Sequence, residues 1–279
     1  MKKILQIIYK QKSDDGICKY AFETGDGHII ESVLIPNKSR QTLCVSSQVG
    51  CRIKCSFCAT ATIPFVRNLT SEEILAQLDI ITGEKGTLNN IVFMGMGEPL
   101  DNYANVKAAV LALNDHKQYN IGQRHISIST VGLADMIRKF SDDNLPANLT
   151  VSLHSASDIG RKAIMGPGHR CSIEQLGDAL EYYRDKVGRK IILSYCLIAN
   201  INDSDSDLGK LIELAKSLDA QINLMQFNAH EKCSHRPASR DQLMKFHAAL
   251  DNAGVTNTIR FSKGNSIAAA CGQLARQRQ

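Results

Sequence analysis

The sequence predicts an α/β fold built on a parallel sheet, either an open doubly wound sheet or a partial barrel. After residue 40, short apolar segments typical of strands alternate with amphipathic segments typical of helices. The strand segments are nearly continuous apolar runs, as expected where helices cover both faces of a parallel sheet. The chain has 279 residues, of which 43% are hydrophobic, which is enough to bury the core of one large domain.

Six strand–helix units account for this alternation, and a further strand follows them. We expect strands over 42–47, 90–95, 125–130, 148–154, 190–198, 222–227 and 256–262. We expect helices over 71–82, 102–114, 133–141, 172–187, 205–218 and 239–253. The first helix opens with Thr70 and Glu73, the spacing of a capping box, in which each side chain bonds the backbone amide of the other residue.

The first forty residues precede this alternation and carry three short strand patterns. The patterns lie over 3–9, 18–23 and 28–35, and short glycine-containing turns separate them. We therefore expect a small N-terminal β-cap or extension over 1–40, followed by the main part of the chain over 41–279.

The composition excludes several classes of protein. No segment approaches the roughly 18–20 apolar residues of a membrane span, and no small-residue cleavage site follows the short apolar run at the start, so we expect neither a membrane protein nor a signal peptide. Nine cysteines, three of them close together, fit a metal site in a reducing compartment, and hence the cytoplasm. The net charge of +5 is compatible with a polyanionic partner but does not require one.

Unusual residues follow the ends of successive predicted strands. They are Cys51 to Cys58, Gly95 to Pro99, Ser129, Ser152 to His154, and Asn228. In parallel α/β architectures, ligands gather at the carboxyl ends of the strands. The sequence therefore predicts one binding site along this edge.

Three of these residues, Cys51, Cys55 and Cys58, have the spacing C-x3-C-x2-C. Thiolates favour iron–sulfur clusters, zinc and copper(I). Three thiolates on a four-iron cluster leave one iron open to an exchangeable ligand, and this is the reading that we favour. The alternative is a zinc site with a remote fourth ligand, such as His116, His154 or Cys233.

The cysteine spacing after the first strand of the alternation resembles that of the radical S-adenosylmethionine (SAM) superfamily. The resemblance implies a partial (βα)6 TIM-like barrel, a [4Fe-4S] cluster whose open iron is chelated by SAM, and cleavage of SAM to a 5′-deoxyadenosyl radical. Phe57 between the second and third cysteines also fits. Gly95 to Pro99 resembles the GGEP element that meets the SAM amino group, although alone it could be a plain strand-to-helix turn.

A narrower resemblance is to the RlmN/Cfr family of radical SAM RNA (adenine) methyltransferases. It rests on the motifs "TLCVSSQVGC", "RNLTSEEI", "NNIVFMGMGEPL", "SISTVG", "VSLHS", "NDSDSD" and "AAACGQL", which occur in this order. The family implies Cys51, Cys55 and Cys58 as cluster ligands, Gly97, Glu98, Ser129, Ser152, Leu153, His154 and Asn228 as SAM contacts, and Cys271, Cys44 and Glu31 as catalytic residues. The region 41–279 would then be the radical SAM core with a C-terminal catalytic-cysteine segment.

The resemblance also implies a mechanism with two cysteines. Cys271 would receive a methyl group from SAM, and the methyl carbon would then join an adenine ring carbon of rRNA or tRNA, carbon 2 in preference to carbon 8. Cys44 would resolve the resulting crosslink, leaving a transient Cys44–Cys271 disulfide. Glu31 would be a proton acceptor. An external electron donor, such as flavodoxin or ferredoxin, would reduce the cluster.

Several features leave alternatives open. The family usually carries an N-terminal helical domain that helps to hold RNA, and we expect a short version lacking it, because the sequence begins close to the β extension. A radical SAM enzyme with a non-RNA substrate, or a metal-bearing RNA-binding or sensor protein without catalysis, are the competing readings. Without the family context, Cys44 and Cys271 would be structural cysteines. A loose basic set comprises Arg124, His125, Arg161, Lys162, His169 and Arg170, and we expect most of its members on a solvated face.

Overall fold

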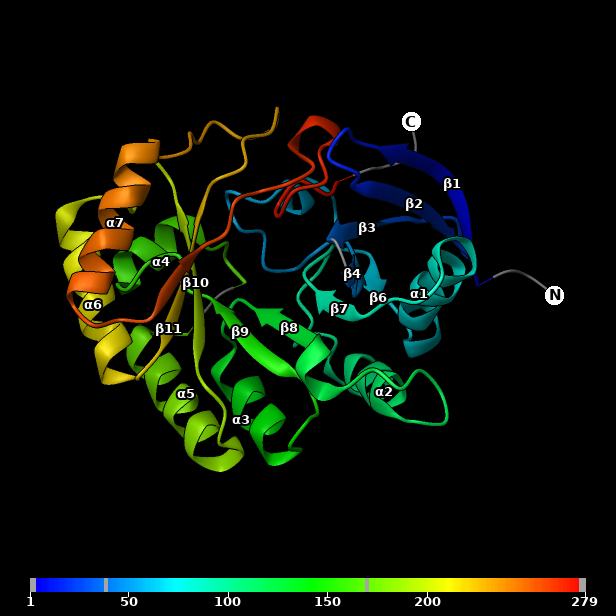
Figure 1. The fold of residues 1–279 in the computed structure, drawn as a ribbon, viewed down its shortest axis with the longest axis horizontal. Coiled ribbons are helices and arrows are strands. Elements are labelled where there is room, and N and C mark those ends of the chain that lie inside the picture. Colours follow the sequence, from blue (N-terminus) through cyan, green and yellow to red (C-terminus); the bar gives the residue numbers. More distant parts are fainter. Residues whose placement is uncertain (1–3, 38–39, 169–170, 276–279) are drawn as a thin grey trace.

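A computed structural model of the chain describes residues 4–37, 40–168 and 171–275. Ten strands form one curved sheet in the order β1-β2-β3-β4-β7-β8-β9-β10-β11-β12. The helices lie along the outer side of this sheet (Figure 1). In the described residues, no helix combines the length and the apolar character needed to cross a membrane.

Seven of the strands are parallel and correspond to the predicted alternation. They are β4 (Arg40–Cys44), β7 (Asn90–Phe93), β8 (Ile126–Thr130), β9 (Asn148–Ser152), β10 (Ile192–Leu197), β11 (Gln221–Gln226) and β12 (Asn257–Ile259). The helices are α1 (Ser71–Lys85), α2 (Tyr103–Asn114), α3 (Ala134–Asp142), α4 (Asp158–Ile164), α5 (Ile173–Val187), α6 (Asp205–Ser217) and α7 (Arg240–Asn252). The α/β class and the partial barrel are thus confirmed.

The main difference from the predicted elements is α4, which lies in a stretch that the sequence pattern left without a helix. Its seven residues are too few to show a helical period. A small hairpin of β5 (Gln48–Val49) and β6 (Arg67–Asn68) was also not predicted, because two-residue strands carry no alternation. Both elements turn out to flank the predicted cysteine site.

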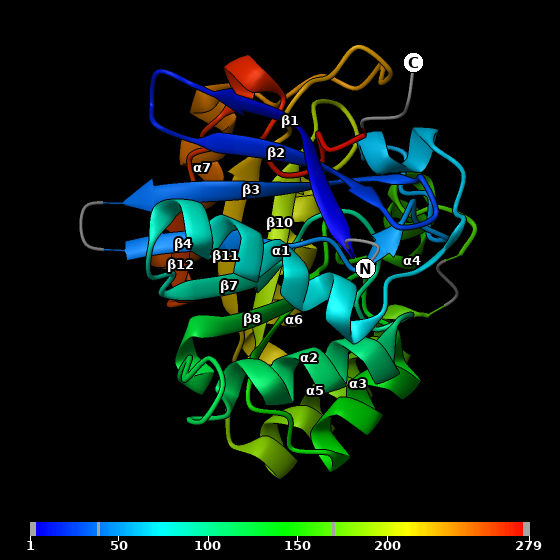
Figure 2. The same cartoon turned by 90° about the vertical axis from the view of Figure 1, so that its right-hand side faces the viewer.

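The N-terminal extension forms an antiparallel meander of β1 (Leu5–Lys12), β2 (Cys18–Thr24) and β3 (Ile29–Asn37). Strand β3 pairs antiparallel with β4, so the meander continues the edge of the parallel sheet (Figure 2). Buried apolar side chains from all parts of the chain form one large cluster, in which residues of the meander are included.

Local sequence fixes where several helices begin. The Thr70 hydroxyl accepts a hydrogen bond from the amide of Glu73 (3.2 Å), and the Glu73 carboxylate accepts one from the amide of Thr70 (2.9 Å). This confirms the predicted capping box at the start of α1. Helices α5 and α6 begin with the same arrangement at Ser172 and Ser204.

Candidate active site

The three predicted cluster ligands lie on one loop between β5 and a short 3-10 helix (Ala59–Thr62). The amide and the hydroxyl of Ser56 both donate to the carbonyl of Ile164, at 2.9 and 3.1 Å, which fastens this loop to α4. Gly166 is required next to the loop, because a Cβ atom there would lie 1.9 Å from the carbonyl oxygen of Ile53. The loop is therefore held on a defined backbone rather than being a free surface turn.

The thiols of this loop suit a metal cluster. Burial raises the pKa of Cys51 to about 12 and raises those of Cys55 and Cys58, and neighbouring thiols contribute to the shift of Cys55. Such thiols stay protonated unless a cation replaces their protons. Among the described residues, no three potential ligands converge on the point where a single metal ion would sit. A four-iron cluster, in which each thiolate binds its own iron, needs wider spacing than one ion does.

Glu98 and Gly97 form the turn that follows β7. Gly97 has a φ of +103°, and a Cβ atom there would lie 2.6 Å from Cβ of Gln48, so only glycine fits. The carboxylate of Glu98 is buried and accepts hydrogen bonds from the amides of Leu100 (3.0 Å) and Val131 (2.8 Å). Burial raises the pKa of Glu98 to about 7, although these hydrogen bonds oppose the rise. A buried carboxyl group at this edge is suited to an ammonium group.

The predicted residues of β8 and β9 lie together. The hydroxyls of Ser129 and Ser152 are 3.2 Å apart. Leu153 is fully buried, and its amide donates to the carbonyl of Ser194 (3.0 Å). The predicted SAM contact of Leu153 stays a prediction.

His154 is a buried residue with a left-handed backbone, φ +53°. Its Nδ1 atom lies 3.0 Å from the backbone nitrogen of Cys196, which can only donate, so the imidazole proton is on Nε2. Burial, with a contribution from the charge of Arg161, lowers the pKa of His154 to about 3. The ring meets Phe57 edge to face at 4.9 Å, beside the cysteine loop. His154 is thus a neutral hydrogen-bond donor next to the site.

Arg161 corrects the expectation of a solvated basic set. It is 1% exposed, and its guanidinium donates to the carbonyls of Val131 (2.7 Å), Leu153 (2.7 Å) and Ser152 (3.3 Å). It therefore joins the end of β8 to the end of β9. His169 and Arg170 of the same set lie outside the described residues.

The C-terminal segment returns to the cysteine loop and carries Cys271 to it. The amide of Ala59 donates to the carbonyl of Gly272 (2.6 Å), and the hydroxyl of Thr60 donates to that of Leu274 (2.7 Å). The side-chain amide of Asn228, at the end of β11, donates to the carbonyl of Cys271 (3.1 Å). The positions next to Cys58 and the predicted SAM contact Asn228 both hold the segment that contains Cys271.

Cys44 and Cys271 come within electrostatic reach of each other. Cys44 is buried at the end of β4; burial raises the pKa of its thiol, and the charge of Cys271 adds to the rise. Cys271 is exposed at the mouth of the site, yet desolvation still raises its pKa, while Arg260 acts in the opposite direction. Two cysteines 227 positions apart in sequence are thus near enough for the charge of one to affect the pKa of the other.

Glu31 lies on β3 and is fully buried. One carboxylate oxygen accepts a hydrogen bond from the amide of Ala275 (2.9 Å), and the other lies 3.3 Å from the ammonium group of Lys19. Lys19 also donates to the carbonyl of Ala268 (3.1 Å). Glu31 and Lys19 therefore hold both sides of the segment that carries Cys271.

A second loop, between β11 and α7, packs over the cysteine loop, and the sequence pattern did not single it out. The ring of His235 is 3.0 Å from the hydroxyl of Ser56, and the thiol of Cys233 is 3.4 Å from the carbonyl of the same residue. His230 lies 3.3 Å from the carbonyl of Phe57. Of the alternative zinc ligands, Cys233 contacts the cysteine loop through the carbonyl of Ser56, and His116 lies 3.7 Å from the carboxylate of Asp115.

Comparison with known proteins agrees with this geometry. The model of the radical SAM superfamily matches residues 45–215. The "Probable dual-specificity RNA methyltransferase RlmN" of Pseudothermotoga lettingae is 41% identical over 274 residues, which cover 98% of this chain and 80% of the relative. The protein of the same name from Thermotoga maritima is 42% identical over 265 residues, which cover 95% of this chain and 77% of the relative.

A crystal structure of a radical SAM methyltransferase from Sphaerobacter thermophilus has a TM-score of 0.93 and 36% sequence identity, covering 97% of this chain and 81% of that one. Streptococcus suis SuiB bound to S-adenosylmethionine, with a TM-score of 0.57 and 12% identity, shares the fold alone over 83% of this chain and 53% of its own. Members of the superfamily use a [4Fe-4S] cluster and SAM, and the three cysteines and the acid at the sheet edge fit these cofactors. The chain therefore belongs to the RlmN family of radical SAM methyltransferases.

Proposed function

We propose that this enzyme methylates a ring carbon of an adenine base in rRNA or tRNA, carbon 2 in preference to carbon 8, in the cytoplasm. The observation that carries the proposal is the position of Cys271. Its segment is hydrogen-bonded to the residues after Cys58, and its thiol lies within electrostatic reach of Cys44. The RlmN names of the relatives support RNA as the substrate.

Two cysteines suit the difficulty of the reaction. An adenine carbon between two ring nitrogens is electron-poor and a weak nucleophile, whereas a thiolate accepts a methyl group readily, so one hard step becomes several easier ones. Bound SAM supplies the methyl group, and with the cluster it supplies radical chemistry. Cys271 carries the methyl group, and one hydrogen atom of that group would be lost to the radical that SAM supplies. The methyl carbon then forms the new bond to the ring carbon, which must lose its proton and one electron before the crosslink is resolved. Cys44 then attacks the sulfur of Cys271, which releases the methylated base and leaves a disulfide.

A positive charge near Cys271 favours the role of this residue in the reaction. Burial keeps the resting thiols protonated, while Arg260 lowers the pKa of Cys271 relative to what burial alone would give. A neighbouring cation therefore helps to form the thiolate that accepts the methyl group. The disulfide must be reduced before the next turnover, and an external one-electron donor of the flavodoxin or ferredoxin kind would serve the cluster.

Intact-protein mass spectrometry tests the proposal. After anaerobic reconstitution of the cluster and incubation with SAM, we expect one methyl group on Cys271, which is lost on addition of RNA and reductant. The variant Cys18→Ala, which changes a buried cysteine of β2, should behave like the parent protein. An intact cluster with Cys271 never methylated would refute the two-cysteine mechanism. Nucleoside analysis of the RNA, with 2-methyladenosine and 8-methyladenosine as standards, then decides the ring position.

A further inference from the structure

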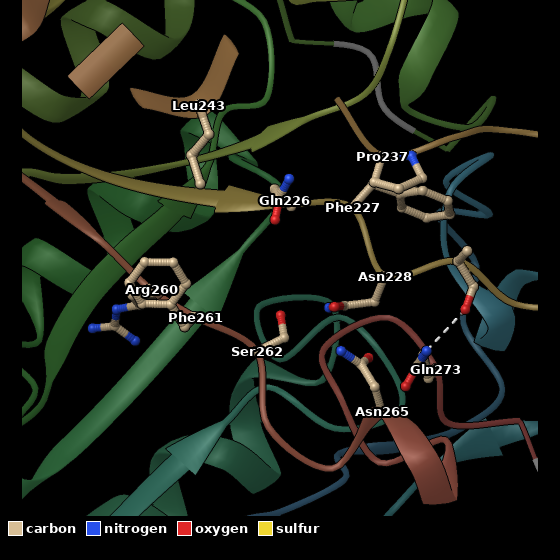
Figure 3. A pocket seen from close by; sticks show the side chains of 11 residues that line it. Gln226, Phe227, Asn228, Pro237, Leu243, Arg260, Phe261, Ser262, Asn265 and Gln273 are labelled. Atoms are coloured by element: carbon tan, nitrogen blue, oxygen red, sulfur yellow. Dashed lines mark hydrogen bonds between the residues drawn. The ribbon is translucent and has the colours of Figure 1, made fainter. Parts of the chain in front are cut away.

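A cavity of about 470 Å³ opens beside the segment that carries Cys271. Its walls come from the end of β11 and from the chain after β12, with Pro237 and Leu243 closing one side (Figure 3). This volume is in the range of sites that bind small organic molecules. Asn228 lines the cavity and also donates to the carbonyl of Cys271, so any occupant lies next to the methyl-carrying residue.

Three amide side chains on the wall of the cavity are engaged by the protein. The side-chain amides of Gln226, Asn228 and Gln273 donate to the carbonyls of Ala238 (2.8 Å), Cys271 (3.1 Å) and Ala229 (2.9 Å). These bonds fix the shape of the wall. The cavity is therefore built into the fold at the ends of two strands, rather than left between loosely packed loops.

Four other residues of the wall differ from these amides in having side chains without a hydrogen-bond partner in the described part of the chain. Arg260, Phe261, Ser262 and Asn265 are exposed, and within residues 4–37, 40–168 and 171–275 their side chains have no hydrogen bond, ion pair or ring contact. Phe261 is 65% exposed, which is costly for a large aromatic ring in water. In Figure 3, Ser262 and Asn265 turn toward Asn228, while Phe261 lies across the open space beside Arg260.

We propose that this cavity binds one nucleotide of the RNA, next to the adenine that is methylated. This inference rests on the proposed function and names a subsite for its substrate. Phe261 provides a face on which a base stacks, and Arg260 a cation for the adjoining phosphate. Ser262 and Asn265 supply hydrogen-bonding groups for a base edge or a ribose hydroxyl.

The charge at the rim of the cavity favours an RNA nucleotide over SAM as the occupant. Arg260 and the neighbouring exposed Lys263 are both cations, and SAM, with a sulfonium, an ammonium and a carboxylate group, has a net positive charge that they disfavour. A nucleotide phosphate is attracted by the same pair. The buried carboxyl group of Glu98, which suits the ammonium of SAM, lies instead at the end of β7.

The absence of tryptophan from the sequence permits a direct test. In the full-length Phe261→Trp variant the only indole lies on the proposed stacking face, and a stacked base quenches its fluorescence. We expect saturable quenching by a ten-nucleotide oligoadenylate, and none by SAM. The matched control is Leu111→Trp, which places the indole at an exposed position of α2 and should show no quenching.

Four further variants, one of them a control, measure the contributions of the aromatic ring and of the cation separately. Phe261→Ala should weaken oligoadenylate binding by about tenfold, as stacking on one aromatic ring allows, and Phe261→Tyr should restore it. Arg260→Ala should weaken binding and reduce its dependence on salt concentration, whereas Lys117→Ala, an exposed cation beyond α2, should change neither. Methylation of Cys271 by SAM should persist in Phe261→Ala, which distinguishes loss of this subsite from failure of the proposed function.

Other outcomes would overturn the subsite. If SAM quenches the fluorescence of Phe261→Trp, and excess SAM displaces the oligoadenylate, the cavity belongs to the cofactor. If the Phe261→Ala variant methylates RNA as well as the parent protein does, the RNA does not use this cavity. If oligoadenylate leaves the fluorescence of Phe261→Trp unchanged, no base stacks there.

Discussion

The carboxylate of Glu31 accepts a hydrogen bond from the backbone amide of Ala275 at 2.9 Å, four residues after Cys271. The same carboxylate is paired with Lys19, which holds the carbonyl of Ala268 on the other side of that cysteine. The N-terminal meander thus positions the end of the chain. The predicted role of Glu31 as a proton acceptor is a separate matter, which substitution can test.

The variant Glu31→Gln should separate positioning from proton transfer. Glutamine can accept the hydrogen bond from Ala275, so the segment should stay in place and methylation of Cys271 by SAM should be within about threefold of the parent. Glu31→Ala removes the acceptor, which costs about 1–3 kcal/mol for an unpaired buried group, and should loosen the segment. Hydrogen exchange at Ala275 measures the loosening. If Glu31→Gln methylates Cys271 normally but stalls on RNA, the carboxylate also takes a proton.

Glu98 should make SAM binding depend on pH. Burial raises its pKa from the usual 4.5 to about 7, so the group is largely neutral at pH 6 and largely ionised at pH 8. If the predicted contact of this carboxylate with the SAM ammonium group is made, affinity should rise with pH and level off above about pH 8. Calorimetry with the reconstituted protein at pH 6, 7 and 8 measures this, and Glu98→Gln should remove the step. A step that persists in Glu98→Gln would assign it to another group.

The raised pKa of Glu98 should also make the free energy of unfolding fall as pH rises, whereas the affinity for SAM rises. Since the folded pKa exceeds that of the unfolded chain, the folded state holds the extra proton between about pH 4.5 and 7. Without SAM, the contribution of Glu98 to the free energy of unfolding is therefore greatest below this window and falls as pH rises through 7. Urea denaturation of the parent and of Glu98→Gln across this range should differ in slope.

His154 should remain neutral at every pH at which the protein is folded. Its pKa is lowered to about 3, and the amide of Cys196 fixes the proton on Nε2. In nitrogen-edited NMR spectra, its Nδ1 and Nε2 signals should keep their shifts from pH 8 to pH 5. Unfolded histidine binds a proton near pH 6.5, so this residue should lower the free energy of unfolding as pH falls below that value. A titration midpoint near 6 would contradict the assignment.

Arg161 should be essential for the stability of the strand ends. Arg161→Met removes the donors to three carbonyls of buried or half-buried backbone and should lower the free energy of unfolding by about 3 kcal/mol. Urea denaturation measures the change. Lys162→Met, the exposed neighbour, is the control and should be within about 0.5 kcal/mol of the parent. An equal effect of both substitutions would show that Arg161 contributes only as any surface charge does.

Cys44→Ala should stop the reaction after the new carbon–carbon bond. Cys271 has no partner to attack its sulfur in this variant, so RNA should stay covalently attached to the protein. Denaturing gel electrophoresis with labelled RNA detects such an adduct. Cys196→Ala, another buried cysteine near Cys271, should release RNA normally. Free methylated RNA from Cys44→Ala would show that a different group resolves the crosslink.

The edge on which the site lies could be predicted because parallel strands end together. The residues after β4, β7, β8, β9 and β11 needed only the strand pattern to be placed on one side of the sheet. Cys51, Cys55 and Cys58 were recognisable because their spacing is local. Apolar periodicity likewise predicted the longer helices and strands, because burial of one face of an element leaves a repeat of apolar residues in the sequence.

Arg161 and the loop of Cys233 could not be predicted in the same way. An arginine in a stretch without helical period is most often solvated, and only the fold shows that three carbonyls surround it. The attachment of Cys271 depends on hydrogen bonds between Ala59 and Gly272 and between Thr60 and Leu274, which leave no local pattern. The resemblance to a family supplied the role of Cys271, and the structure supplied what holds it.

The contacts of Lys19 with Ala268 and of Glu31 with Ala275 span 249 and 244 positions of sequence. During synthesis the strands of the meander emerge long before their partners exist, so these bonds can close only after the segment around Cys271 has left the ribosome. A chain that stopped before this segment would possess Cys51, Cys55 and Cys58 but lack Cys271. Synthesis of the segment around Cys271 is thereby a condition for assembly of the site, because the meander holds both sides of that segment.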